Sequence, residues 1–356
     1  MSEGHEETPA DLFEEKRDQY LEWLSPLFFP RDPLSHDIIR FFASVLRVSG
    51  MEGQGWDPQL ESRALLNDLN ALMKLDFPSE GFADGQTAWR LGLLMYNHIL
   101  EMSAPYEVIA NLLRFRLEEG YSPNPFYKYL SDKDRKRFKK TGLFPKQKIG
   151  IISDLSERAG LEVGKIFEDF VDFDLRNAIS HSDFIIIGDD FRISGNTRSS
   201  SRSIPLADLD ITITAAKAFA SAFFVSEQEM RRAWGNNAGR AIPYDQHYKA
   251  LMEVLTDKEG LMTGFKVHWP NGEESYYRRT PEGIDMVNCF LSVQQETVEL
   301  FVGMYARKPG NFSPLVEQDA EPNYSPMEGT DELPVWNALA AAAKQELLPE
   351  VNLGRR

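Results

Sequence analysis

Arg176, Asn177 and His181 lie within one short segment, LRNAISHSDF, and their side chains suit chemistry on a phosphate ester. Histidine has an ordinary pKa near neutrality, so His181 is suited to moving a proton. The guanidinium of Arg176 is always charged and can hold two phosphate oxygens by parallel hydrogen bonds. Asn177, one turn before His181 in a helix, can orient the histidine or the phosphate. The three residues therefore predict proton transfer and charge stabilisation at phosphorus.

Three Arg residues in the chain are followed by a His after four to six residues. Arg31–His36 and Arg240–His247 each enclose a proline, which does not fit a continuous helix. Arg176–His181 alone falls in an uninterrupted helical pattern, predicted from Glu162 to about His181.

At 100° per residue, the stripe formed by Ile166, Phe170 and Phe173 continues through Asn177, Ser180 and His181. A buried polar group without a partner costs roughly 1–3 kcal/mol, so we expect this face to meet a pocket, a subunit interface or both. The alternative is that Arg176 pairs with a nearby acid and His181 stabilises the helix C-terminus.

The elements that must position these residues are mostly helices. Periodic apolar residues, Pro and Gly predict helices at 12–28, 37–48, 58–75, 87–101, 105–119, 146–159 and 205–232. After residue 183 the apolar period changes from 3.6 to 2, which predicts a β-hairpin of residues 184–187 and 191–193 around Gly188. Residues 194–203 read as a polar loop.

The last third of the chain reads as a separate unit. Residues 261–279 predict two strands around a Pro-Asn-Gly turn, and residues 286–305 predict a helix. His268, in the first of these strands, reads as structural. Residues 309–334 lack apolar content and read as a linker, followed by a short helix at 336–348.

Composition narrows the function classes. The 356 residues are 42% hydrophobic and 26% charged, as in a globular protein, with a net charge of −16. Such an acidic chain is not a general nucleic-acid coat, so any polyanion must bind locally. A single cysteine, an acidic N-terminus and the lack of an apolar stretch as long as a membrane span predict a cytoplasmic protein without a disulfide or membrane contact.

Several catalytic signatures are absent from the sequence. The chain has no phosphate-binding loop, no dinucleotide-binding glycine pattern, no zinc-protease pair of histidines and no serine-hydrolase elbow. The acidic residues from 168 to 174 could be imagined as metal ligands, but a solvated helix face explains them better. We therefore expect no metal site and no cofactor.

The segment FEDFVDFDLRNAISHSDFIII resembles the HEPN superfamily, the higher eukaryote and prokaryote nucleotide-binding domain. A helical hairpin precedes the segment, and a β-hairpin and a long helix follow it. The resemblance covers about residues 86–232. It implies an α-helical bundle with Arg176, Asn177 and His181 at the active-site positions, because family members carry Arg, a polar residue and then His at this spacing.

The resemblance also implies a function. The expected activity is that of a metal-independent endoribonuclease of toxin or antiviral-defence type, with RNA as substrate, a homodimeric state and an inhibitory protein partner. The alternative is a HEPN-like module that only binds nucleotide or RNA, or only dimerises.

Other polar residues are candidates for supporting roles. Ser180, His98 and Glu101 are accessory candidates, since His98 and Glu101 share a face of the helix after Thr87. Residues 133–148 hold eight Lys or Arg and one Asp. Arg135, Arg137, Lys139 and Lys140 in this stretch, with Phe138 to stack on a base, are the candidates for RNA binding.

We therefore expect a mainly α fold with four parts. They are an N-terminal helical region (1–85), a HEPN-like helical domain with a small β-hairpin (86–232), a small α+β unit (233–308), and a linker with a short helix (309–356).

Overall fold

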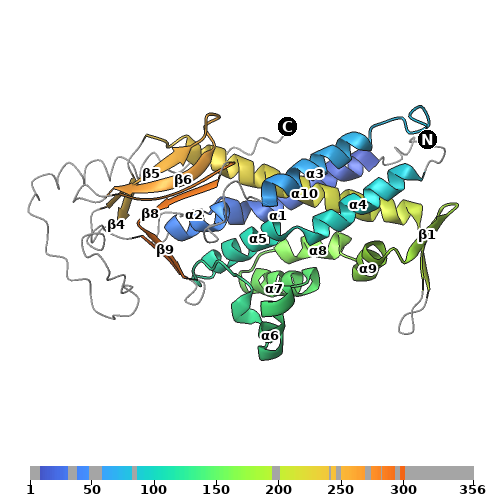
Figure 1. Ribbon diagram of the computed structural model, residues 1–356, viewed down its shortest axis with the longest axis horizontal. Coiled ribbons are helices and arrows are strands. Elements are labelled where there is room, and N and C mark those ends of the chain that lie inside the picture. The colour runs from blue at the N-terminus through green and yellow to red at the C-terminus, as the bar shows by residue number, and fades with distance from the viewer. Residues whose placement is uncertain are drawn as a thin grey trace, which may run out of the picture. The chain divides into compact units, whose positions relative to one another are not determined.

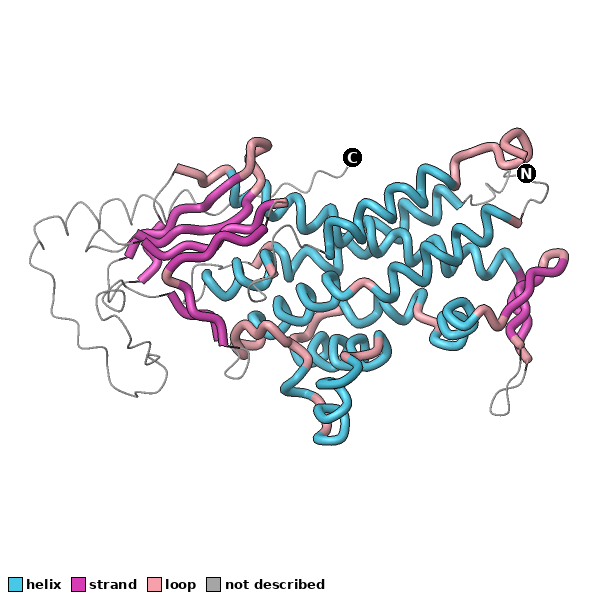
Figure 2. The backbone as a smooth tube through the Cα atoms, in the orientation of Figure 1, coloured by secondary structure: helices cyan, strands magenta, loops and turns pink. Residues whose placement is uncertain are grey.

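The computed structural model describes residues 9–30, 38–47, 58–81, 86–194, 201–239, 242–245, 250–268, 274–281, 283–292 and 297–300. This part of the chain is mainly helical, with small antiparallel sheets (Figures 1 and 2). The linker and the short helix expected after residue 308 lie outside the described residues, as do Arg31, His36, Arg240 and His247.

The chain divides into two compact units. The first contains Met1–Pro30, Asp57–Glu119 and Pro125–Glu227, and the second contains Arg31–Trp56, Gly120–Asn124 and Gln228–Arg356. Most of the region 1–85 therefore belongs to the same unit as residues 125–227, where the sequence suggested a separate region.

The first unit is a bundle of helices. Its helices are α1 (Pro9–Phe28), α3 (Pro58–Leu72), α4 (Thr87–Glu101), α5 (Ser103–Arg116), α6 (Asp132–Thr141), α7 (Pro145–Arg158), α8 (Val163–Phe170), α9 (Phe173–His181) and most of α10 (Leu206–Gly235), with a 3-10 turn, η1 (Tyr127–Tyr129). Neighbouring pairs include α1 with α5 and α8, α3 with α4, α4 with α9, and α7 with α5 and α8. The helices predicted before residue 160 and the long helix from 205 are confirmed.

Aromatic side chains fill the core of this unit. Phe170 stacks on Phe219 with ring centroids 5.5 Å apart, and Phe167 meets Phe219 edge to face at 5.3 Å. Phe223 continues the cluster to Phe28 at 5.9 Å. The expected apolar face of α10, which includes Phe219 and Phe223, is therefore the buried face.

A three-stranded antiparallel sheet follows α9 directly. Its strands are β1 (Phe184–Ile187), β2 (Asp190–Ile193) and β3 (Arg202–Pro205), in that order. The predicted β-hairpin is confirmed, with Phe184 opposite Ile193 and Ile187 opposite Asp190. The third strand was expected to be the end of a loop, and it pairs with β2 because Ile204 fills the buried position opposite Phe191.

The described part of the second unit contains α2 (Ile38–Leu46), the end of α10 and seven strands. Strands β4 (Ile242–Asp245), β5 (Ala250–Thr256), β6 (Met262–His268), β7 (Glu274–Thr280) and β8 (Gly283–Val287) form one sheet in chain order, and β9 (Cys289–Ser292) pairs with β10 (Thr297–Leu300). Phe42 of α2 packs edge to face on Trp234 and stacks on Phe265. The two strands predicted within 261–279 are confirmed.

The helix predicted at 286–305 is wrong, because β8, β9 and β10 occupy the described part of that range. Asn288 adopts a left-handed backbone (φ 46°), which ends any helix there. The expectation that no stretch reaches the length of a membrane span also needs correction. By length and composition α10 is such a stretch, although most of it is buried.

Candidate functional site

The helix that carries Arg176, Asn177 and His181 is short and separately capped. Asp172 precedes α9, and its carboxylate accepts hydrogen bonds from the backbone N–H groups of Asp174 (3.0 Å) and Leu175 (2.9 Å). At the other end, Ser182 adopts a left-handed conformation (φ 58°) and the N–H of Asp183 bonds the carbonyl of Ala178. The helix expected from Glu162 to His181 is thus two helices.

Tyr96 of α4 fixes the break between α8 and α9. Its hydroxyl donates to the carbonyl of Phe170 (3.0 Å) and accepts from the N–H of Asp172 (3.1 Å). Burial raises the pKa of this phenol, so it stays protonated and able to donate. The Tyr96 hydroxyl thus satisfies backbone groups that an unbroken helix would pair internally.

The break rotates α9, so the predicted stripe does not continue across it. Leu175, Ala178 and Ile179 form the buried face, whereas Asn177, Ser180 and His181 are exposed. The expectation that these polar groups continue a buried face was wrong. It assumed 100° per residue through Val171 and Asp172, which are not helical. The exposed position leaves them accessible from solvent.

Arg176 is held by two partners. Its Nε lies 2.5 Å from a Glu101 carboxylate oxygen, Nη2 forms an ion pair with the same oxygen, and Nη1 donates to Asn177 (3.0 Å). A guanidinium has five N–H donors. These contacts occupy three, so two donors on the Nη nitrogens remain for an oxyanion.

The accessory candidates differ in where they lie. Glu101 joins the site through Arg176, and Ser180 donates to the side-chain oxygen of Asn97 on α4 (2.9 Å). A ring nitrogen of His98 instead lies 3.2 Å from the carbonyl of Ser62, so His98 serves the contact between α4 and α3. His181 is exposed, and no side-chain partner for it occurs among the described residues.

Two cations beside the site were missed by sequence reasoning. Arg202 of β3 forms an ion pair with Asp172 (2.6 Å), the cap of α9. Lys148 of α7 is buried and donates to Ser103 (2.9 Å). Burial lowers the pKa of Lys148, and the carboxylates of Glu107 and Glu101 oppose that shift. No local pattern marks either residue, because their partners lie 30 and 45 positions away.

The acidic residues Asp169 and Asp172 make separate contacts. Asp169 binds Lys16 and the hydroxyl of Tyr20, both at 2.8 Å, while Asp172 caps α9. Within the described ranges, no group of three or more His, Cys, Asp or Glu side chains is arranged to hold a metal ion.

The RNA-binding candidates on α6 point in different directions. Arg135 donates to the carbonyls of Tyr127 (3.3 Å) and Lys128 (3.0 Å) and lies over the Tyr127 ring. Arg137 is exposed and lies over the ring of Phe144 at 4.5 Å. The side chains of Lys139 and Lys140 are outside the described part of the structure. Phe138, expected to stack on a base, packs against Tyr127.

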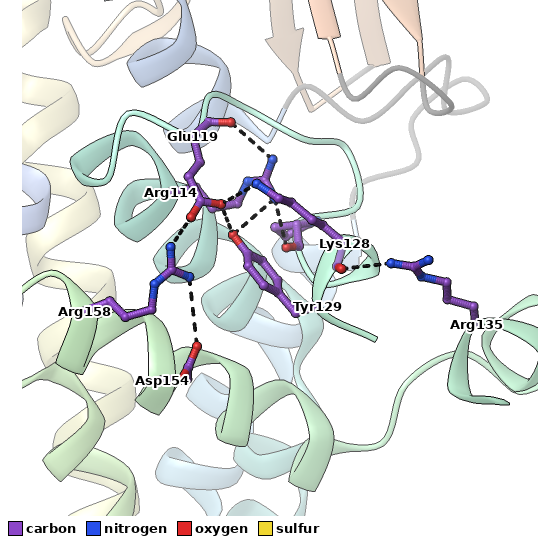
Figure 3. Close-up of polar contacts among 8 residues, drawn as sticks. Arg114, Glu119, Lys128, Tyr129, Arg135, Asp154 and Arg158 are labelled. Carbon is purple, nitrogen blue, oxygen red and sulfur yellow. Dashed lines mark hydrogen bonds and ion pairs between the residues drawn. The ribbon is translucent and has the colours of Figure 1, made fainter. Parts of the chain in front are cut away.

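The loop before α6 is tied to the bundle by Glu119. Figure 3 shows its carboxylate between the hydroxyl of Tyr129 and the guanidinium of Arg158, while Lys128 also reaches it (3.0 Å). Burial acts to raise the pKa of Glu119, but these three hydrogen bonds outweigh it and lower that pKa to about 2. Glu119 is therefore ionised at neutral pH and joins α5, η1 and α7.

Comparisons of this chain with protein-family models, with curated proteins and with solved structures give no match.

Proposed function

We propose that α9 carries the active site of a metal-independent endoribonuclease of HEPN type. The observation behind this proposal is the arrangement of three residues on one short helix. His181 is open to solvent, and Arg176 is oriented by Glu101 and Asn177 with two donors to spare. A base and a fixed cation carried by one helix are the two groups that internal transesterification of RNA requires.

The reaction needs no external nucleophile. His181 takes the proton of the ribose 2′-hydroxyl, whose oxygen attacks the adjacent phosphorus. The bond from phosphorus to the 5′ oxygen breaks, and that oxygen takes a proton from water. Arg176 stabilises the negative charge that builds up on the phosphorus-bound oxygens, and Glu101 fixes the plane of its guanidinium. The products are a 2′,3′-cyclic phosphate and a 5′-hydroxyl.

The test is cleavage of an RNA panel by the purified protein in EDTA. We expect cleavage, with cyclic-phosphate and 5′-hydroxyl ends identified by mass spectrometry. Cleavage only after Mg²⁺ is added, or ends that carry a 5′-phosphate, would contradict the proposal.

An alternative is a HEPN-like module that binds RNA or nucleotide, or dimerises, without chemistry. The acidic residues around α9 favour the dimerisation form of this alternative, since Glu101 offsets the charge of Arg176 and Asp172 offsets that of Arg202. If the protein binds RNAs of the panel but cleaves none of them, the non-catalytic alternative is correct. The wider role that we propose is cytoplasmic toxin or defence activity, restrained by an inhibitory protein.

We also expect a homodimer formed through α9 and β1. Ile185 and Ile187 share one face of β1, an edge strand among the described residues, and are 54% and 47% exposed. Such an apolar edge favours a partner, and a two-fold contact between identical surfaces supplies one. Light scattering should give twice the 40.6 kDa of one chain. Changing both isoleucines to lysine should give the monomer, whereas a monomeric parent at high concentration would contradict the expectation.

A further inference from the structure

Cationic side chains that lie over aromatic rings follow the chain from η1 through α6 to α7. Arg135 lies 5.4 Å from the ring centroid of Tyr127, and Arg137 lies 4.5 Å from that of Phe144. Lys146, in the first turn of α7, lies 5.6 Å from the ring of Phe173. The series thus passes from the basic segment to the first residue of α9.

A ring affects a cation differently from a carboxylate. An aromatic face attracts the cation without neutralising it and leaves its N–H donors available to phosphate oxygens. Many basic side chains elsewhere in the described chain are paired with acids, among them Lys16, Lys165, Arg192 and Arg232. Lys133, Lys136 and Lys146 are exposed and form no ion pair within the described ranges.

The basic residues of α6 are divided between two faces. Lys133, Lys136 and Arg137 are spaced by three and four positions and share one face, which is exposed. Arg135 lies on the opposite face, where its donors are committed to η1, as Figure 3 shows for the carbonyl of Lys128. The outer face therefore has the exposed cations of α6, and Arg135 holds the helix in place.

Lys146 connects this surface to the proposed active site. Phe173 and Asn177 are one turn apart on the same face of α9, and His181 lies one turn further on. At 1.5 Å per residue, α9 spans about 12 Å from Phe173 to His181, which is roughly the length of two nucleotides in an extended strand. In Figure 1, α6, α7, α8 and α9 lie along the same edge of the helical bundle.

We propose that Lys133, Lys136, Arg137 and Lys146, with the rings of Phe144 and Phe173, form a track that binds single-stranded RNA and leads it to Arg176 and His181. The cations hold phosphates, and the rings offer faces on which unpaired bases stack. A duplex hides its bases, so it gains only the phosphate contacts. This inference rests on the proposed endoribonuclease function and specifies how its substrate is held.

The first experiment measures binding by fluorescence anisotropy with the full chain and a labelled 20-nucleotide single-stranded RNA. The track variant carries Lys133→Gln, Lys136→Gln and Arg137→Gln. The control variant carries Lys74→Gln, Lys165→Gln and Lys258→Gln, which removes the same charge from other exposed sites. Three lost phosphate contacts should weaken binding about tenfold and reduce the slope of log K against log salt by about 2.

The second experiment tests base stacking on Phe144 and substrate docking by Lys146 separately from the charge of α6. Phe144→Leu should weaken binding of the single strand by at least about fivefold and leave binding of a duplex of the same length unchanged. Lys146→Gln should raise the KM for cleavage several-fold and leave kcat unchanged, because Lys146 acts on docking and not on the reacting phosphate.

Equal losses in the track and control variants would overturn the inference, since they would reflect net charge alone. Binding of anionic lipid vesicles in place of RNA would also overturn it. A parent protein that cuts RNA while the track variant binds as tightly as the parent removes the track and leaves the proposed function standing. If the parent protein binds RNA without cutting it, and only the track variant loses affinity, the track stands and the proposed endoribonuclease function is removed.

Discussion

Replacing His181 by alanine is expected to lower the rate of RNA cleavage by about 10²–10⁴-fold without changing the affinity for RNA. The imidazole is the group to which we assign proton transfer, so its loss removes a step and not a docking contact. His181 is exposed and has no side-chain partner in the described structure, so the fold should tolerate the change. Single-turnover kinetics, with circular dichroism as the check on folding, measure the effect.

The matched control is His268→Ala. His268 lies in the five-stranded sheet of the other unit, where its ring nitrogens face Glu253 (3.1 Å) and Glu274 (3.3 Å). That variant should cut RNA at the parent rate. If the His181→Ala protein cuts RNA as well as the parent, His181 is not the catalytic base and the non-catalytic alternative is favoured.

Arg176→Lys sharpens the same test. Lysine keeps the positive charge but loses the planar fork, so it cannot bind Glu101, Asn177 and a phosphate together. If Arg176 stabilises the transition state, the variant should lose about 10²–10³-fold in kcat. Activity equal to that of the parent would show that charge alone suffices at this position.

Glu119→Gln is expected to lower the free energy of unfolding by about 2 kcal/mol, because glutamine cannot supply the carboxylate that binds Arg158, Lys128 and the Tyr129 hydroxyl. The Glu119 side chain is 13% exposed, whereas Arg158 and Lys128 are 43% and 53% exposed, so solvent screens part of each ion pair. For a unit of this size the loss should lower the melting temperature by roughly 4–8 °C in calorimetry. Glu162→Gln, which breaks the exposed pair with Lys165, should change the unfolding free energy by less than about 1 kcal/mol.

The pH dependence of that difference gives a second measure. The folded pKa of Glu119 lies at about 2, below its ordinary value of 4.5. Its contribution to stability is therefore fully present above pH 4.5 and is lost as the pH falls through about 2. The gap between parent and Glu119→Gln should narrow over that window. A gap that stays constant down to pH 2 would show that Glu119 acts by shape and not by charge.

Most helices could be predicted because their apolar periods are long and their ends carry Pro, Gly or capping residues. Thr87–Glu101 was predicted to the residue, and the hairpin at Phe184 was clear from its change of period. The strands after residue 283 were missed, because Ile284, Met286 and Val287 also fit a helical pattern over so short a run.

Sequence spacing placed Arg176, Asn177 and His181 on a helix, but it did not predict how that helix is oriented. No Pro or Gly marks the break at Val171 and Asp172, and its cause is Tyr96, a residue more than 70 positions earlier. Sequence spacing could place Glu101 on the same helix face as His98, but it could not show that the Glu101 carboxylate binds Arg176. The role of Arg202 was hidden for the same reason, since a strand pairing brings it to Asp172.

The shortness of α9 affects the stability of the proposed site. A helix of nine residues is not stable alone in water, so α9 owes its order to Leu175, Ala178 and Ile179 and to its contacts with α4. Unwinding it exposes little apolar surface compared with melting the bundle, so it opens at a smaller free energy. Arg176 and His181 then separate while the long helices remain intact. Mild heat or denaturant therefore inactivates the proposed site before it unfolds the protein.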